Sequence, residues 1–332
     1  MNVLVTGHKG YIGAHLVPLL IEKGHTVTGC DINLYEGTGW EDVVKPQQEW
    51  IRDVRNLTVE DLRGHDAVMH LAALSNDPMG DVNEELTYQI NLEGSVRLAE
   101  LAKEAGVLRF LFASSCSIYG KGAKLDMDES DPVNPLTAYA KSKIESEKRI
   151  SALADDTFSP TFLRNATAYG HSPMFRIDLV VNNLLACAVA KGNIAIKSDG
   201  SPWRPLIHCK DIAHAFVALA EAARDKVHNL IVNVGGNEEN FQVKDVADEV
   251  QKLLPEAEIV YTGEVGEDPR NYKVNFDLLN SVLPNFQLEY TLQKGMQELH
   301  QKLTEHQFSE QDFDGDQCVR LRTLRHRLDL IQ

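Results

Sequence analysis

Tyr139 and Lys143 stand four residues apart in a stretch, residues 138–153, whose pattern favours a helix. Positions i and i+4 share one face of a helix, so this phenol and this ammonium can point into the same cleft. A free tyrosine has a pKa of about 10, and a neighbouring positive charge lowers that pKa toward the range in which a phenolate accepts protons. Ser115, at the end of the preceding predicted strand, adds a hydroxyl that can bond a substrate oxygen. The three residues predict acid–base chemistry at a carbinol or carbonyl group; the alternative for such a tyrosine and lysine is a surface pair.

The N-terminus carries a second group of residues with a chemical meaning. Residues 3–13, VLVTGHKGYIG, read as a strand, a glycine loop and the start of a helix. Glycines let the backbone approach a pyrophosphate closely, and the first N–H groups of a helix bind its negative charge. This order of elements predicts a dinucleotide site, because a strand precedes the loop and a helix follows it. The predicted cofactor contacts in this loop are Gly7, Gly10, Tyr11, Ile12 and Gly13.

Asp31 stands 24 residues after Gly7, at the end of the next predicted strand. A carboxylate at this place can accept hydrogen bonds from the adenosine ribose and would repel the 2′-phosphate of NADP. The alternative is that Asp31 only caps a turn. We therefore predict NAD as the cofactor, with NADP as the alternative because Lys9 adds a positive charge to the glycine loop.

Short apolar runs alternate with longer amphipathic stretches in the first half of the chain. Helical patterns between the apolar runs span residues 12–23, 88–105 and 138–153. Strands separated by helices predict a doubly wound, parallel α/β sheet of the Rossmann type. The predicted strands are residues 3–6, 26–30, 67–71, 109–114, 160–164 and, late in the chain, 231–234.

Polar loops and shorter helices follow Tyr169. We expect residues 1–169, together with the late strand, to form a dinucleotide-binding domain, and residues 170–332 to form mainly a smaller α/β substrate-binding lobe. That lobe would stand at the carboxyl ends of the strands, where open α/β sheets bind ligands. The tail from residue 305 has leucines at helical spacing among arginines. It predicts one amphipathic helix docked on the body, with a partner-binding or oligomerisation helix as the alternative.

Composition narrows the remaining choices. The net charge of −16 argues against a nucleic-acid partner. The five cysteines contain no CxxC pair, so neither a metal site nor a disulfide framework is predicted, and a reducing compartment is expected. No apolar stretch approaches the length of a membrane span, and the N-terminus lacks the features of a signal peptide. We expect a cytoplasmic protein without a membrane partner.

Several short segments, in this order and spacing, resemble one known family. Its motifs are the GxxGxxG loop at residues 7–13, HLAA at 70–73, SSCSIYG at 114–120 and YAKSK at 139–143. They are similar to the extended, nucleotide-sugar-modifying branch of the short-chain dehydrogenase/reductase superfamily, and the resemblance runs over nearly the whole chain. It implies an NAD-dependent enzyme whose catalytic residues are Ser115, Tyr139 and Lys143.

The resemblance also implies roles for residues outside the catalytic trio. Further cofactor contacts are implied for Asp53, Val54, Leu71, Ala72 and Ala73, as well as for Tyr139 and Lys143. Asn91 would tie a helix bend to the neighbouring strand, and His70 is better explained as a packed histidine than as a catalytic one. For Tyr119 a place beside the cleft and a place in the core are both open. The family commonly forms homodimers through two helices of each subunit, here residues 88–105 and 138–153.

Positions at which this sequence differs from the family's motifs narrow the set of reactions that the resemblance implies. Sugar 4,6-dehydratases of this family carry an Asp-Glu pair after the catalytic Ser/Thr, where this chain has Cys116 and Ser117. The 3,5-epimerising relatives have a cysteine one position later than Cys116. Dehydration and 3,5-epimerisation are therefore disfavoured, and Cys116 is expected to be a small packed residue. What remains is an epimerase acting at C4 through a 4-keto intermediate, or a nucleotide-sugar 4-ketoreductase using NAD or NADP. A non-catalytic dinucleotide sensor or scaffold is opposed by the complete Ser-Tyr-Lys set.

The implied substrate is a nucleotide-diphosphate sugar. Arg204 and Arg270 fit the pattern of arginines that clamp the diphosphate, because guanidinium groups donate paired hydrogen bonds to phosphoryl oxygens. Asn182 resembles a residue that contacts substrate near the diphosphate. Thr167 stands where many relatives have an asparagine, and Asn165 could partly replace that asparagine. The substrate-binding residues predicted are thus Ser115, Thr167, Asn182, Arg204 and Arg270.

Overall fold

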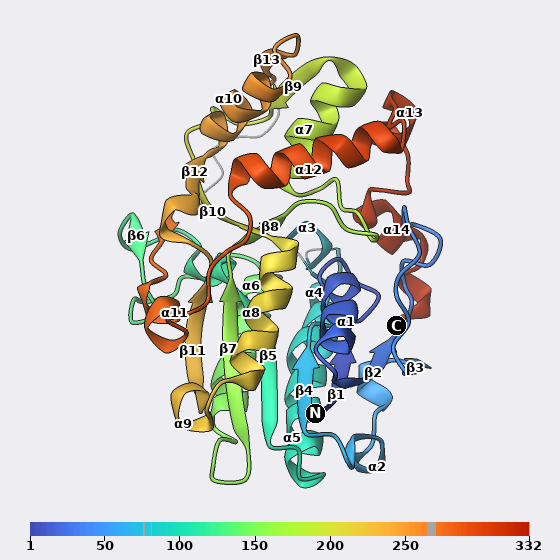
Figure 1. Cartoon of the computed structure of the whole chain (residues 1–332), viewed down its shortest axis with the longest axis vertical. Helices are drawn as coiled ribbons and strands as arrows, with labels where there is room; N and C mark the ends of the chain where they lie inside the picture. The colour runs from blue at the N-terminus through green and yellow to red at the C-terminus, as the bar shows by residue number, and fades with distance from the viewer. Residues whose placement is uncertain (76, 81, 264–269, 332) are drawn as a thin grey trace.

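The computed structural model of the chain describes residues 1–75, 77–80, 82–263 and 270–331. Its centre is a seven-stranded parallel sheet in the order β11-β7-β5-β4-β1-β2-β3, with helices on both faces (Figure 1). Every strand predicted from the sequence is present, with bounds within one residue of those expected, so the doubly wound Rossmann sheet is confirmed. The strands are β1 (Asn2–Thr6), β2 (Thr26–Asp31), β3 (Gln48–Ile51), β4 (Ala67–His70), β5 (Arg109–Ser115), β7 (Ser159–Asn165) and β11 (Leu230–Val234).

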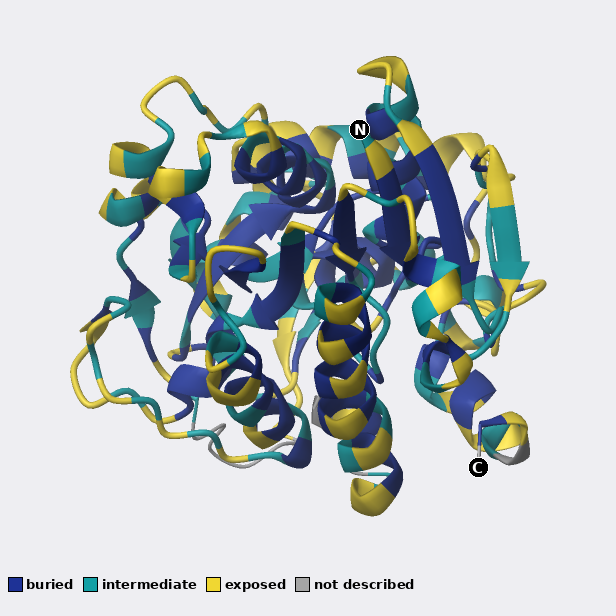
Figure 2. Cartoon of the chain, turned by 90° about the horizontal axis from the view of Figure 1, so that it is seen from below, coloured by how far each residue is buried: buried dark blue, intermediate teal, exposed yellow. Residues whose placement is uncertain are grey.

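Alternate side chains of the strands pack against the helices on the two faces of the sheet, because successive strand residues point to opposite faces. Val3 and Val5 of β1 pack in one apolar cluster with α1 (Gly13–Glu22) and α8 (Cys209–Glu221). Leu4, between them, packs in a second cluster with α5 (Gly94–Glu104) and α6 (Ala138–Ser151). Figure 2 shows the result, with buried strands between helices that are buried on one side and exposed on the other.

The predicted helix over residues 88–105 begins with a π-helical turn, η2 (Tyr88–Glu93), before α5 continues it. Asn91 lies in this turn and is fully buried. Its side chain accepts a hydrogen bond from the N–H of Leu74 at 2.8 Å and donates one to the Leu74 carbonyl at 3.1 Å. The asparagine therefore ties the irregular turn to the segment after β4, which is the role expected for it.

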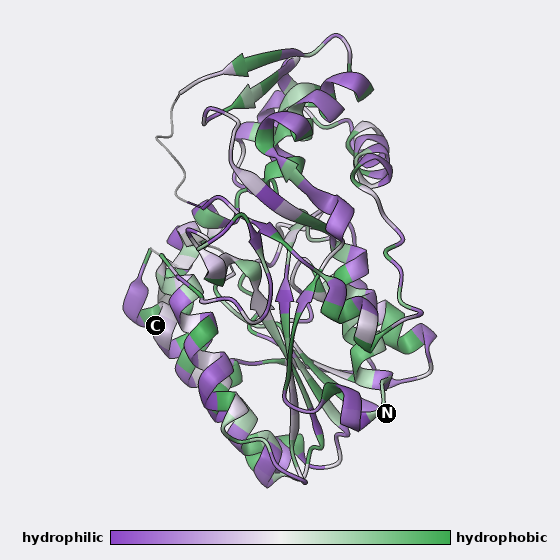
Figure 3. Cartoon of the chain, turned by 90° about the vertical axis from the view of Figure 1, so that its left-hand side faces the viewer, coloured by the Kyte–Doolittle hydropathy of each residue, from purple (hydrophilic) through white to green (hydrophobic). Residues whose placement is uncertain are grey.

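A second lobe stands above the carboxyl ends of the strands, as the edge-on view of the sheet shows (Figure 3). A three-stranded sheet, β12-β10-β8, and the pair β13-β9 belong to it. Its helices bury a core of their own around Leu185, Val250 and Leu299. The elements of this lobe are β8 (Thr167–Tyr169), α7 (Val180–Lys191), β9 (Asn193–Ile196), β10 (Trp203–His208), β12 (Asn240–Gln242), α10 (Val243–Leu253), β13 (Glu258–Tyr261) and α12 (Leu292–Glu305).

Short elements complete the chain. Among the described residues, none of the helices has both the length and the apolar character that a bilayer span requires. The short elements are η1 (Val54–Asn56), α2 (Val59–Leu62), α3 (Asp77–Gly80), α4 (Glu84–Thr87), η3 (Cys116–Tyr119), β6 (Asp126–Met127), α9 (Arg224–Val227), η4 (Asn237–Glu239), β14 (Lys273–Val274) and α11 (Asp277–Val282).

The tail departs from the single amphipathic helix that its leucine spacing predicts. It forms three short helices, α13 (Glu310–Asp314), α14 (Arg320–His326) and η5 (Leu328–Leu330), and they are docked on the body (Figure 1). Residues 315–319 are not helical, because the chain turns there from the second lobe toward the Rossmann sheet. The sequence pattern located the apolar residues but not this change of direction.

Candidate active site

One cavity of about 890 Å³ lies at the carboxyl ends of the parallel strands and continues into the second lobe. This is the place where open α/β sheets bind ligands, and the volume lies within the range of ligand pockets. All but one of the predicted site residues line it. These are Gly7, Gly10, Tyr11, Ile12, Gly13, Asp31, Asp53, Val54, Leu71, Ala72, Ala73, Ser115, Tyr139, Lys143, Thr167, Arg204 and Arg270.

The glycine loop is packed so tightly that side chains are excluded from it. Gly7 has a φ of +74°, and a Cβ there would lie 2.7 Å from the backbone nitrogen of Ala72. A Cβ on Gly13 would collide with the carbonyl oxygen of Gly7 and lie 2.7 Å from the Cα of His8. The N-terminal end of α1 therefore reaches the cavity with bare backbone, an arrangement that fits the pyrophosphate of a dinucleotide.

Two carboxylates line the cavity beside this loop. Asp31 accepts hydrogen bonds from the N–H of Lys9 at 3.1 Å and the N–H of Asn33 at 2.8 Å. It thus caps the turn after β2 while also lining the cavity, so both interpretations of this aspartate describe part of its contacts. Asp53 caps η1 through the N–H of Arg55 and forms a salt bridge with the Arg55 guanidinium at 2.7 Å.

The three residues predicted to be catalytic converge on the same cavity from two elements. Ser115 ends β5, and its hydroxyl oxygen accepts a hydrogen bond from the N–H of Ser117 at 3.1 Å. Tyr139 and Lys143 lie one turn apart on α6, whose N-terminus is capped by the Thr137 hydroxyl. The ammonium nitrogen of Lys143 stands 5.7 Å from the centre of the Tyr139 ring. A strand end and a helix face therefore bring together the three groups that the sequence singles out.

Lys143 sits in a largely apolar pocket behind Tyr139. Its ammonium donates a hydrogen bond to the carbonyl of Ala113 at 2.7 Å and lies 4.7 Å from the centre of the Phe112 ring. Burial lowers the pKa of Lys143 to about 7, and the nearby Glu147 carboxylate opposes this shift. A lysine with such a pKa can change its charge near neutral pH, which is unusual for an ammonium group.

A buried ion pair holds the rear of α6 against β7. The Arg164 guanidinium contacts the Glu147 carboxylate at 2.8 Å, with both side chains almost fully buried, and the Ser114 hydroxyl also donates to Glu147. Arg164 donates to the Tyr119 hydroxyl at 3.2 Å, and Tyr119 in turn donates to Asn233 at 2.8 Å. Tyr119 is fully buried in the core and does not line the cavity, which decides between its two open interpretations.

His70 is likewise a packed residue. It is 1% exposed, and its two ring nitrogens bond the hydroxyls of Thr6 at 2.6 Å and Ser95 at 2.8 Å. Burial, with a smaller contribution from the Lys143 charge, lowers the pKa of His70 to about 3. The imidazole therefore joins β1 and β4 to α5 as a neutral group.

Cys116 and Ser117 occupy the two positions after Ser115. Cys116 is 1% exposed, its thiol donates to the Arg164 carbonyl at 3.1 Å, and burial raises its pKa well above the usual value. A thiol held in this way is a poor acid or base near neutrality. The Ser117 hydroxyl is buried at the cavity wall and has no hydrogen-bond partner among the described residues.

The predicted substrate-side residues fall into two groups. Arg204 and Arg270 are neighbours, because an Arg204 N–H donates to the backbone carbonyl of Arg270 at 2.6 Å, and both line the cavity. Thr167 lines the cavity from β8. Asn165, at the end of β7, donates to the Ser114 carbonyl at 3.3 Å, while its carbonyl oxygen has no donor within the part of the chain that the structure describes. Asn165 is thus available to accept a hydrogen bond inside the cavity.

Asn182 is the exception, and its predicted contact with substrate needs correction. It is fully buried and does not line the cavity. Its side chain accepts from the N–H of Gly170 at 2.8 Å and donates to the carbonyl of Arg176 at 2.8 Å and to the Tyr11 hydroxyl at 3.1 Å. The bond to Tyr11 joins the glycine loop to the second lobe. The neighbouring Asn183 lines the cavity in its place.

Sequence reasoning also missed a set of charged residues around the cavity. Arg176, which is buried, forms an ion pair with Asp178 in the segment before α7, and Lys197 follows β9. No motif marks these positions. The only available signal was the alternation of arginine and leucine in the tail, which contributes Val319, Arg320, Leu321, Arg322 and Ile331 to the cavity lining.

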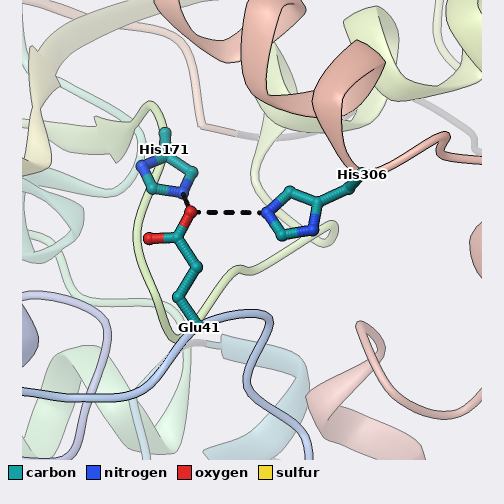
Figure 4. A group of neighbouring side chains, drawn as sticks. All are labelled: Glu41, His171 and His306. Carbon is teal, nitrogen blue, oxygen red and sulfur yellow. Dashed lines mark hydrogen bonds and ion pairs between the residues drawn. The ribbon is translucent and has the colours of Figure 1, made fainter.

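Within the described residues, one group outside the cavity could offer three metal ligands (Figure 4). Its members come from three segments, and the two imidazoles both point toward one oxygen of Glu41. That oxygen lies 3.3 Å from Nε2 of His171 and 3.4 Å from Nε2 of His306. The Lys302 ammonium lies 3.3 Å from the same oxygen, so the carboxylate already has a cationic partner.

Comparison with known proteins places this site in a family. The model of the NAD-dependent epimerase/dehydratase family matches residues 3–235. The chain belongs to this family. The UDP-glucose 4-epimerase of Lactobacillus helveticus is 32% identical over 240 residues, which cover 65% of this chain and 71% of that protein. The UDP-glucose 4-epimerase of Homo sapiens is 30% identical over 275 residues, which cover 70% and 77%.

Solved structures agree with this assignment. MoeE5 in complex with UDP-glucuronic acid and NAD has a TM-score of 0.80 at 28% identity, covering 92% of this chain and 99% of that one. The UDP-glucose 4-epimerase of Thermotoga maritima, at 22% identity, shares the fold with a TM-score of 0.81. The predicted membership of the extended short-chain dehydrogenase/reductases is confirmed, as is the prediction of an enzyme with NAD as its cofactor.

Proposed function

We propose that this enzyme inverts the configuration at C4 of a UDP-linked sugar through a transient 4-keto intermediate. The observation that carries the proposal is the shared cavity, in which Ser115, Tyr139 and Lys143 lie together with the glycine loop. Relatives named as UDP-glucose 4-epimerases support the uridine nucleotide and the position of the reaction. The buried Cys116 thiol, in place of the acidic pair of dehydratases, favours epimerisation over loss of water.

The chain's own residues would move one proton and orient one sugar. NAD⁺, held by the glycine loop and Asp31, would supply reversible hydride transfer at C4. Tyr139, as a phenolate, takes the proton from the C4 hydroxyl while the C–H bond breaks, and gives it back when the carbonyl is reduced. Lys143, when charged, stabilises that phenolate. Ser115 donates a hydrogen bond to the same sugar oxygen and holds it beside the phenol.

The remaining site residues would bind the two nucleotides. We assign the diphosphate of the sugar nucleotide to Arg204 and Arg270, and hydrogen bonds to the nucleotide or sugar to Thr167, Asn165 and Asn183, in place of Asn182. The backbone of the glycine loop and Asp31 would hold the pyrophosphate and the adenosine ribose. The other residues assigned to the dinucleotide are Asp53, Val54, Leu71, Ala72, Ala73, Tyr139 and Lys143.

Domain division, assembly and location belong to the same proposal. Residues 1–169 with β11 would bind the dinucleotide, and residues 170–332 would supply most of the substrate contacts. We expect a cytoplasmic homodimer, because the family commonly pairs the helices that correspond to η2–α5 and α6. All five cysteines are free and buried, as suits a reducing compartment. Analytical ultracentrifugation tests the dimer, and a monomer at micromolar concentration would contradict it.

A Tyr139→Phe variant tests the catalytic assignment with UDP-glucose as substrate. We expect the wild type to interconvert UDP-glucose and its C4 epimer, measured by NMR, without net oxidation or reduction of the nicotinamide. The variant should bind NAD⁺ like the wild type but turn over about 10²- to 10⁴-fold more slowly, since it lacks the proton-transfer group. Equal turnover would refute the role of Tyr139. Stoichiometric consumption of reduced nicotinamide with a 4-keto substrate would identify a 4-ketoreductase instead.

A further inference from the structure

The last residues of the chain close the adenosine end of the cavity. Residues 318–331, here called the C-terminal clamp, run from the second lobe to the segment that follows β2 (Figure 1). An Arg327 N–H donates to the carbonyl of Leu34 at 2.8 Å, and an Arg55 N–H donates to the carbonyl of Ile331 at 2.6 Å. The clamp is also sealed by an apolar cluster that consists of Leu34, Leu74, Met79, Leu86, Leu324 and Ile331.

Arg320, the first residue of α14, carries the only arginine side chain of the described part of the clamp that is both buried and in the cavity lining. It is 4% exposed. Its guanidinium stands 4.6 Å from the centre of the Tyr35 ring, and one N–H donates to the Met174 carbonyl at 3.1 Å. The Nε–H of Arg320 is buried, and residues 1–75, 77–80, 82–263 and 270–331 offer it no hydrogen-bond partner.

The charge of Arg320 is compensated at longer range by the carboxylates of Asp178 and Asp31 rather than by a direct ion pair. In the part of the chain that the structure describes, it forms no ion pair within 4.0 Å, whereas the nearby Arg176 is paired with Asp178. Burial, together with the positive charge of Arg176, lowers the pKa of Arg320 to about 10. A buried cation with a free donor is costly unless an anion or a hydrogen-bond acceptor satisfies it. The cavity wall therefore presents positive charge that a bound anion would neutralise.

We propose that Arg320 binds the phosphoryl oxygens of the dinucleotide, so that the C-terminal clamp completes the cofactor site. The inference rests on the proposed function in one respect, that a dinucleotide occupies the glycine loop. A diphosphate is also part of the implied sugar nucleotide. Arg320 contacts Tyr35, close behind Asp31 in sequence, whereas Arg204 and Arg270 border the second lobe. This placement assigns Arg320 to the dinucleotide.

The test compares ligands with and without phosphate on the purified enzyme stripped of nucleotide. ADP-ribose, adenosine and UDP are titrated by calorimetry into the wild type and into Arg320→Met. A lost charge-assisted hydrogen bond should weaken ADP-ribose binding about tenfold or more, with adenosine and UDP changed less than about twofold. Arg320→Lys should recover part of the loss. The affinity of the wild type for ADP-ribose should also fall more steeply with added salt than that of Arg320→Met, since salt screens the charge.

Two control variants separate the charge of Arg320 from the fold of the clamp. Arg325 lies on the same helix, is exposed and does not line the cavity, so Arg325→Met should bind all three ligands like the wild type. Arg327→Met removes the bond to Leu34 without touching the cavity, and it should weaken adenosine and ADP-ribose by the same factor.

The outcomes separate a failure of the role proposed for Arg320 from a failure of the proposed function. Unchanged ADP-ribose affinity in Arg320→Met overturns the inference, as does a loss confined to UDP, which would move Arg320 to the sugar nucleotide. Equal losses for adenosine and ADP-ribose in Arg320→Met would reduce the residue to a structural part of the clamp and likewise overturn it. If the wild type itself binds neither ADP-ribose nor NAD⁺, the proposed function fails first, whatever the variants do.

Discussion

The cavity has two walls that are built in different ways. The N-terminal wall consists of the glycine loop, residues 7–13, and the ends of β4 and β5, and its contacts follow from short motifs. The C-terminal wall consists of residues 174–178 and the C-terminal clamp, and its contacts join distant parts of the chain. Arg327 and Leu34, for example, are 293 residues apart. One wall is specified locally, and the other exists only once the chain has folded back on itself.

The two walls also differ in what holds them. The N-terminal wall is backed by parallel strands, and the buried pair of Arg164 and Glu147 fixes α6 behind it. The clamp consists of helices of seven and three residues, which are too short to be stable by themselves. Its order therefore depends on Leu324, Ile331 and the bonds made by Arg327 and Arg55. We expect the first wall to be rigid and the second to open without unfolding of the sheet.

The largest effect is expected from a methyl group added to the N-terminal wall. In Gly13→Ala the new Cβ would overlap backbone atoms of Gly7 and His8, which cannot rotate away. The loop must shift, and we expect NAD⁺ to bind at least about 100-fold more weakly, measured by calorimetry. Gly24→Ala is the control for backbone strain, because Gly24 has a φ of +80° but does not line the cavity, so this variant should lose some stability and keep the wild-type affinity for NAD⁺. Wild-type affinity in Gly13→Ala would show that the first wall is more adaptable than its packing indicates.

The same contrast explains what the sequence could predict. The glycine spacing, the strand ends and the Tyr139–Lys143 pair are local features, so their geometry follows from a few neighbouring residues. Arg320 could not be found in this way, because its burial depends on contacts with Tyr35 and Met174. The leucine spacing of the tail marked apolar residues, but several paths of the chain satisfy the same spacing.

Asn182 and Asn183 show that prediction from the sequence can miss a cavity residue by one position. Adjacent residues on a helix point about 100° apart, because 3.6 residues make one turn. A one-residue difference on α7 thus separates a side chain that bonds Gly170 and Arg176 from one that lines the cavity. The family resemblance located this segment, but it did not determine which of the two asparagines faces the cavity. The choice needs the phase of the helix, which tertiary packing determines.

A substitution in the C-terminal wall should have a smaller effect, confined to the local stability of the C-terminal clamp. Leu324 is fully buried against Leu34 and Ile331, so Leu324→Ala should cost about 2 kcal/mol, at the low end for a buried leucine. Because the clamp is terminal, this cost should appear as local opening, with hydrogen exchange of residues 320–327 about 30-fold faster. The midpoint of global unfolding should barely change. Leu299→Ala, in the core of the second lobe, is the control and should lower the global midpoint. A global loss in Leu324→Ala without faster local exchange would mean that the clamp unfolds only with the body.

The smallest effect, counted per pH unit, compares the two buried cations beside the cavity. Burial lowers the pKa of Lys143 to about 7 and that of Arg320 to about 10. Between pH 7 and 10 the unfolded chain keeps a proton on Lys143 that the folded chain has lost, so unfolding takes up a proton. The cost of burying the Lys143 charge is thus fully present below pH 7 and is relieved as pH rises. The folding stability of the wild type should increase relative to Lys143→Met by at most about 1.4 kcal/mol per pH unit over this range.

Arg320 stays charged in both states up to about pH 10, so the stability difference between the wild type and Arg320→Met should stay flat from pH 7 to 9. Urea unfolding of the nucleotide-free proteins at several pH values measures both differences, with the same set of other titrating groups cancelling in each comparison. A flat difference for Lys143→Met would mean that the ammonium keeps its charge in the folded state. Lys143 would then be a permanent cation like Arg320, and Tyr139 would be activated by a charge that does not change with pH in this range.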